Sequence, residues 1–292
     1  MMKKVGYAVG AVIAAWVISG LLMHFGMQRH AILDFDPEIA DAVPGERIAK
    51  ALVAVMDHEL GSTTGWRPND FILWGPTLFA DNNANRQLGI LLAVRETTRV
   101  MKDHLTKVSS DQYDANLVDA DTFFRNDAAR LWFPSAESRF RAGVSKLQDY
   151  VAGLHENPPR SKLLNRRNVE LIRLFQSWSD MLGDAHSSLY REDVTFFASD
   201  DVFYHAHGVA HAMYHVLRAV RVEYQPSMQN RAILDTLFEE CAAALYQAAT
   251  LKPLFVLNGG PASIYANHRK NLDAYVNEAR QKMYSIREEL EK

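Results

Sequence analysis

The sequence has a single cysteine, Cys241, among its 292 residues. One cysteine cannot form an intrachain disulfide, and it excludes the zinc and iron–sulfur sites that are built from several cysteines. Positive charge is not in excess either, because 32 Lys and Arg stand against 35 Asp and Glu, a net charge of −3. Without a basic excess to neutralise phosphates, no general nucleic-acid binding is expected.

Familiar catalytic and nucleotide-binding motifs are missing from the sequence as well. It contains no G-x-S-x-G, no P-loop, no G-x-G-x-x-G after a strand and no H-E-x-x-H. His58-Glu59 begins like the last of these, but the second histidine does not follow. These absences favour a protein that acts through binding over an enzyme.

Charged residues are missing from one long N-terminal run. Between Val5 and Met27, 23 residues contain no Asp, Glu, Lys or Arg. A helix of this length crosses a hydrocarbon layer of about 30 Å. Lys3 and Lys4 precede the run, so the positive-inside rule predicts a cytoplasmic N-terminus and an exported remainder. The residues after it suit no A-x-A cleavage site, which favours a retained anchor over a signal peptide.

Small residues recur at four-residue spacing on one face of this anchor, at Gly6, Gly10 and Ala14. Such spacing lets two membrane helices approach closely, so a homodimer is one interpretation. The other is that glycine and alanine are common in membrane helices.

The rest of the chain predicts an all-α fold, because no run alternates polar and apolar residues long enough for a strand. We divide it into a cytoplasmic tip and anchor (1–27), a tether with two prolines (28–44) and a periplasmic helical domain (45–292). Apolar residues at alternating steps of three and four predict a bundle of six or seven amphipathic helices. Six such series start at Leu91, Phe140, Leu171, Val202, Leu234 and Leu272.

Two aromatic stretches, 61–82 and 109–134, lack this periodicity and are expected to be long loops that cap the bundle. The second ends in Leu131-Trp132-Phe133. Their aromatic side chains either pack into the protein or contact a membrane interface or a partner.

Histidine is concentrated in one predicted helix, which holds His205, His207, His211 and His215. The last three are spaced i, i+4 and i+8, so they share a face, and pairs at this spacing can bind zinc, nickel or copper. We place this histidine face opposite the apolar series, outside the core, beside a strip of small residues that would let a neighbouring helix come close. A solvated polar face is the alternative, since no Glu-x-x-His pair completes a metal site.

Three strings, GWRPND (65–70), DNNANRQLGILLAVRETTRVMKDHL (81–105) and LWFPSAESRFRAGVSKLQDYVAGL (131–154), resemble a proteobacterial family of unknown function, DUF2333. The resemblance implies a single-span protein of the bacterial inner membrane with a mostly helical remainder. It implies no activity and no functional residues.

Together these features predict an interaction or scaffold subunit of an envelope assembly. Its expected partners are envelope or inner-membrane proteins and, through residues 5–27, the lipid bilayer; it needs no cofactor. The alternative is a periplasmic protein that binds a divalent transition metal through His207, His211 and His215. An unrecognised hydrolase is a third hypothesis.

Overall fold

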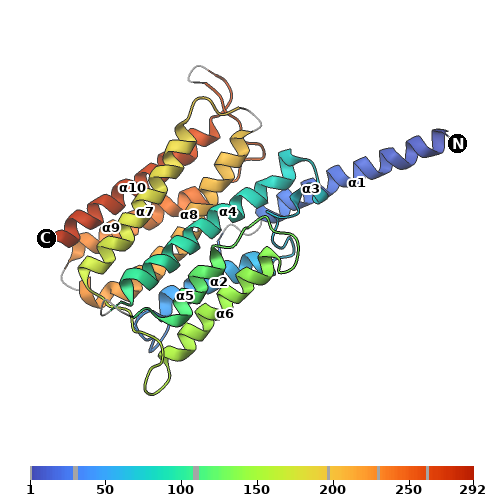
Figure 1. Ribbon diagram of the computed structural model, residues 1–292. Helices are drawn as coiled ribbons and strands as arrows, with labels where there is room; N and C mark the ends of the chain where they lie inside the picture. Colours follow the sequence, from blue (N-terminus) through green and yellow to red (C-terminus); the bar gives the residue numbers. More distant parts are fainter. Residues whose placement is uncertain (1, 29–31, 108–111, 196–197, 229–230, 261–262) are drawn as a thin grey trace.

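The fold is known from a computed structural model, which describes the chain except for residues 1, 29–31, 108–111, 196–197, 229–230 and 261–262 (Figure 1). The described residues form no named strand, so the all-α prediction is confirmed. The helices are α1 (Met2–Gln28), α2 (Glu46–Gly61), α3 (Phe71–Trp74), α4 (Thr77–Val100), the π-helix η1 (Met101–Leu105), α5 (Ala115–Phe124), α6 (Ala136–Leu154), α7 (Asn168–Tyr190), α8 (Ser199–Met228), α9 (Ala232–Thr250) and α10 (His268–Glu291).

All six apolar series lie on helices, in α4 with η1 and in α6 to α10. Eight helices of ten or more residues follow α1 in the described chain, more than the expected six or seven. One reason is α5, which lies inside a stretch expected to be a loop. The Asp114 carboxylate caps its first turn by accepting from the N–H groups of Asn116 and Leu117, and Leu117, Ala120 and Phe124 face the core.

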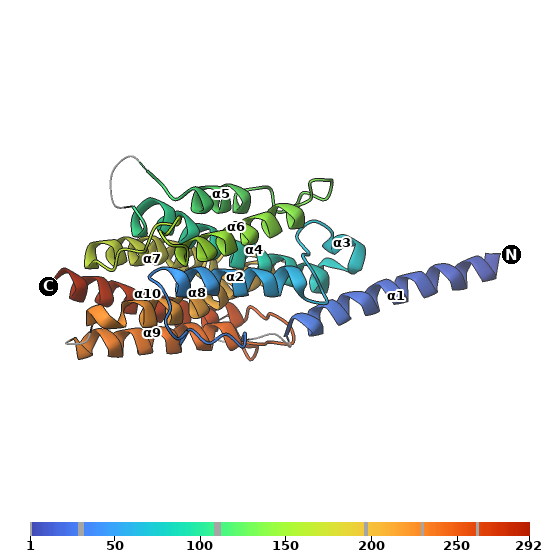
Figure 2. The same ribbon diagram turned by 90° about the horizontal axis from the view of Figure 1, so that it is seen from below.

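The long helices run alternately up and down and pack in two groups (Figures 1 and 2). One group is α2, α4, α5 and α6, and the other is α7, α8, α9 and α10. The contact of α4 with α8 joins the two groups, and α8 also packs against α2, α7, α9 and α10. Helix α8 is therefore surrounded by other helices.

The bundle has two distinct ends. Helix α1 leaves from one of them, together with the connections α2–α4, α5–α6, α7–α8 and α9–α10; we name it the α1 end (Figure 2). The far end holds the start of α2, the π-helix η1 and the C-terminus. The described part of the tether lies along α8, where the Leu33 N–H donates to His215 and the Arg218 guanidinium donates to the Phe35 carbonyl.

Candidate functional site

The histidine face of α8 is buried. His211 and His215 have no exposed surface and His207 is 7% exposed. The expectation that this face lies outside the core is therefore wrong. The physical reason is the position of α8 between the two helix groups, because neighbouring helices cover the face that its own sequence marks as polar.

The small residues beside the histidines do bring a neighbour close, as predicted. A Cβ atom added to Gly208 would lie 1.9 Å from the carbonyl oxygen of Arg86 on α4. In return, a Cβ atom on Gly89 of α4 would lie 2.0 Å from the carbonyl oxygen of His205. The two helices thus cross backbone to backbone, and each presents a glycine to the other.

The three imidazole rings contact different parts of the protein. His207 bonds the backbone carbonyl of Ala249 at the end of α9, and His215 Nε2 accepts the N–H of Leu33 at 3.3 Å. The rings of His211 and His215 meet edge to face, with centroids 5.0 Å apart. Burial, aided by the nearby charges of Arg86 and Arg218 respectively, lowers the pKa of His207 to about 3 and that of His215 to about 4.

These rings do not form a recognisable metal centre. Among the described residues, no group of three or more His, Cys, Asp or Glu side chains is placed to hold a metal ion. Neutral imidazoles are the form that binds metals, but a site also needs converging ligands. The metal hypothesis for His207, His211 and His215 stays a prediction, to be decided by zinc or copper titration with His211→Ala as the comparison.

A buried charged cluster next to the histidines was not predicted. Arg86 Nη2 lies 2.9 and 2.7 Å from the two carboxylate oxygens of Glu59, and Gln87 donates to the same carboxylate at 3.2 Å. Gln87 also bonds the loop after α2, through the carbonyl of Gly65 and the N–H of Arg67. The cluster joins α2, α4 and that loop. In the sequence, Arg86 and Gln87 are two of several polar residues in the first half of α4, and no local pattern links them to Glu59.

A second buried ion pair lies near the far end of α8. The Glu223 side chain is fully buried, and its Oε1 accepts from Arg166 Nε and Nη2 at 2.9 and 2.7 Å. Arg47 Nη1 approaches the other carboxylate oxygen at 4.0 Å. The pair fixes the loop before α7 against α8.

Three aspartates lie together near the α1 end without such pairing. Asp200 and Asp201 are in the first turn of α8, and Asp81 is in the second turn of α4. Burial and the repulsion of the two neighbouring carboxylates raise the pKa of Asp81 to about 8. Burial and Asp201 raise that of Asp200 to about 6. Asp201 accepts from the Asn85 amide at 2.6 Å, and in the described structure none of the three forms an ion pair with Lys or Arg.

Helix α1 is fastened to the bundle along its second half. Trp16 Nε1 donates to the carbonyl of Ile72 at 3.1 Å. Gly20 packs against Gly75 so closely that a Cβ atom on Gly75 would lie 2.4 Å from the Gly20 Cα. His24 is buried and its Nδ1 lies 3.1 Å from the side-chain nitrogen of Asn82. Residues 3–15 of α1, by contrast, are all exposed.

Two of the larger cavities described have volumes of about 210 and 220 Å³, and few side chains that could act in catalysis line them. The first lies between the tether and α8 and has Glu38, Arg218 and Arg221 in its wall. The second has Lys252 and His268 beside Phe203 and Leu251. Neither brings a carboxylate together with a histidine, which is the arrangement that would favour acid–base catalysis.

Comparison with known proteins gives a family but no activity. No curated protein and no solved structure matches the chain. A family described as an uncharacterized protein conserved in bacteria matches residues 3–189 and 184–292, which together include almost the whole sequence. The chain therefore belongs to the bacterial DUF2333 family.

Proposed function

We propose that this protein is a single-pass anchor and scaffold of the bacterial inner membrane, which holds its helical domain in a fixed orientation for envelope partners. The observation that carries this proposal is the attachment of α1, whose second half packs through Gly20 and His24 onto α3 and α4. A freely hinged tether would let the domain tumble, whereas this packing holds its surfaces at constant angles to the membrane.

The same packing supports a retained anchor over a cleaved signal peptide. Cleavage near residue 27 would remove Gly20 and His24 from a site where both are buried. Loss of the second half of α1 would expose the surfaces of α3 and α4 that it covers. By the positive-inside rule, the lysines at positions 3 and 4 support a cytoplasmic N-terminus and a periplasmic domain.

Reporter fusions test this topology. A reporter that is active only outside the cytoplasm, fused after Lys292, should be active, and a cytoplasmic reporter at the same place should be silent. Mass analysis of the purified protein should find residues 1–27 still attached. The reverse reporter pattern, or a chain shortened near residue 27, contradicts the proposed anchor.

Affinity capture from mild detergent with mass spectrometry tests the scaffold role. Gly75→Leu should loosen the attachment of α1, because its side chain would collide with the Gly20 backbone. Gly61→Leu is the matched control, since a Cβ atom there meets nothing within 4 Å. Envelope proteins should be recovered with the unmodified chain and with Gly61→Leu, and reduced with Gly75→Leu at equal protein level. Equal recovery with all three would show that a fixed orientation is not needed.

Gly6 and Gly10 lie on the exposed half of α1, with open space around them. A homodimer through this face remains part of the proposal, and disulfide trapping of Gly10→Cys in a Cys241→Ala background tests it.

A further inference from the structure

Large apolar side chains are exposed mostly at one end of the bundle. Outside α1, 17 such side chains are exposed in the described chain, and 11 of them belong to the α1 end. The far end has four, spread over separate elements. The α1-end residues are Ile72, Leu73, Trp74, Leu131, Trp132, Phe133, Tyr190, Leu254, Phe255, Ile264 and Tyr265.

The contacts between α1 and the bundle determine how deep the α1 end lies relative to the hydrocarbon layer of the bilayer. If Lys3 and Lys4 lie at one surface, about 20 residues of helix fill the hydrocarbon layer, which then ends near His24. Ile72 of α3 contacts α1 at Trp16, and Gly75, which directly follows α3, contacts it at Gly20, four to eight residues before that level. At about 1.5 Å per residue, α3 lies roughly 6–12 Å inside the hydrocarbon boundary.

The residues of α3 suit that depth. Ile72 and Leu73 are 64% and 70% exposed, and the short helix contains no charged side chain. Trp74 is 37% exposed, and its indole N–H bonds the Asp70 carboxylate at 3.0 Å, so its polar atom is satisfied. Apolar side chains exposed on a helix that packs against a membrane span are stable where lipid covers them.

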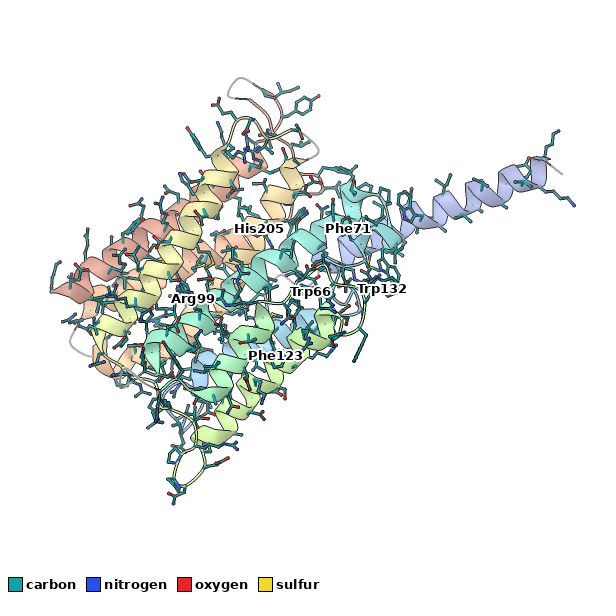
Figure 3. The ribbon with its side chains drawn as sticks, viewed as in Figure 1. Trp66, Phe71, Arg99, Phe123, Trp132 and His205 are labelled. Atoms are coloured by element: carbon teal, nitrogen blue, oxygen red, sulfur yellow. The ribbon has the colours of Figure 1, made fainter. Side chains whose placement is uncertain are left out.

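A second loop reaches the same level. Trp132 and Phe133 are 80% and 90% exposed, and the loop that carries them is bonded to the α3 segment. Trp66 Nε1 donates to the Ala128 carbonyl at 2.9 Å, and Asn69 bonds Glu137 at 3.0 Å. Figure 3 shows Trp132 and Phe71 together at the end from which α1 leaves. Exposed Arg130 precedes the apolar residues, as at membrane surfaces where arginine reaches lipid phosphates.

We propose that the α1 end is a membrane-docking surface, in which α3 and residues 131–133 insert into the lipid leaflet on the domain's side. Its occupant is lipid, because the surface is continuous with the span and lies at the depth that α1 sets. The inference rests on the proposed anchor and adds a second attachment that the span alone does not provide. The helical bundle would then contact the membrane directly through its α1 end, in addition to its connection through α1.

Tryptophan quenching in lipid nanodiscs that hold one copy of the full chain tests this docking. The five tryptophans allow single-Trp proteins made by Trp→Phe substitution, and the probe is phospholipid brominated along its acyl chains. Trp16 in the span is the positive control, and buried Trp178, bonded to Thr97, is the negative control. Trp132 and Trp74 should be quenched to an extent comparable with Trp16, and Trp178 should be unchanged.

The outcomes separate the two proposals. Quenching of Trp16 without quenching of Trp132 and Trp74 overturns the docking surface and leaves the anchor intact. Absence of quenching at Trp16 overturns both. If replacing buried Trp66 or Trp178 prevents folding, Trp132→Phe alone in the otherwise unchanged chain gives the same answer. This substitution should reduce the fraction of tryptophan fluorescence that brominated lipid quenches. An unchanged fraction would contradict the docking surface.

Discussion

The two ends of the bundle differ in how their buried acidic side chains are neutralised and in which side chains cover their surfaces. At the far end, buried acids are neutralised by cations, as where Glu223 meets Arg166 and Glu46 meets Lys50 at 2.6 Å. At the α1 end, Asp81 and Asp200 are held near other acids with raised pKa values, and apolar side chains cover the surface. Deeper in that half, Glu59 and Arg86 form a buried ion pair.

The difference is understandable if the two ends meet different media. Ion pairs with partly exposed cations suit an end that faces water, where the outer atoms stay hydrated. Carboxyl groups that hold their protons, and exposed aromatic side chains with charged residues beside them, suit an end that faces the membrane. The buried acids of the two ends thus agree with the docking surface, although they are a different set of residues from the apolar side chains that define it.

The largest effect is expected from breaking the far-end ion pair. Arg166→Met leaves the fully buried Glu223 carboxylate with Arg47 alone, 4.0 Å away. Removing one partner of a buried pair costs about 3–5 kcal/mol in unfolding free energy. Denaturant unfolding of the full chain in mild detergent measures it.

The control for this prediction is Arg191→Met at the α1 end, where the Arg191–Asp193 pair is exposed on both sides. The unfolding free energy of Arg191→Met, measured in the same way, should not change measurably. An equal loss of unfolding free energy in the two variants would show that the buried Arg166–Glu223 pair stabilises the fold no more than an exposed pair does.

The next largest effect is a difference in stability loss between substitutions of buried apolar residues and substitutions of exposed apolar residues at the α1 end. Leu147 of α6 is fully buried, so Leu147→Ala should cost about 2–5 kcal/mol. Trp132 is 80% exposed, and Trp132→Ala should change stability by about 0.5 kcal/mol or less in detergent. Thermal unfolding of both variants checks the pair. A large loss at Trp132 would mean that this side chain serves the fold rather than the membrane.

The sequence predicted the helices that have a regular apolar periodicity or a distinctive local composition. The uncharged run identified α1, and steps of three and four identified α4 and α6 to α10. Helix α5 was missed because its series, from Leu117 to Phe124, is short and set among aspartates.

The candidate site was harder to predict, because its environment comes from distant parts of the chain. The spacing of His207, His211 and His215 correctly put them on one helical face, but burial depends on α4, α9 and the tether, which the spacing does not contain. Glu59 and Arg86 are 27 residues apart, and Gly20 meets Gly75 across a much longer separation. No local pattern links such partners.

The smallest effect concerns the acids of the α1 end. The pKa of Asp81 is about 8 in the folded protein, against an ordinary value of 3.8, because of burial and then of Asp201 and Asp200. Between these values the folded state binds a proton that the unfolded state has released, so stability falls as pH rises from about 4 to about 8. Asp81→Asn stays neutral at every pH and removes this loss.

The variant should therefore melt at a higher temperature than the unmodified chain, with a difference that grows from pH 5 to pH 8. Because part of the Asp81 side chain reaches solvent, screening limits the gain over this range to about 1 kcal/mol. Asp184→Asn, on the exposed surface of α7, is the matched control and should show no growth with pH. A gain for Asp81→Asn that is the same at both pH values would mean that Asp81 is ionised in the folded protein, and that the α1 end tolerates charge as the far end does.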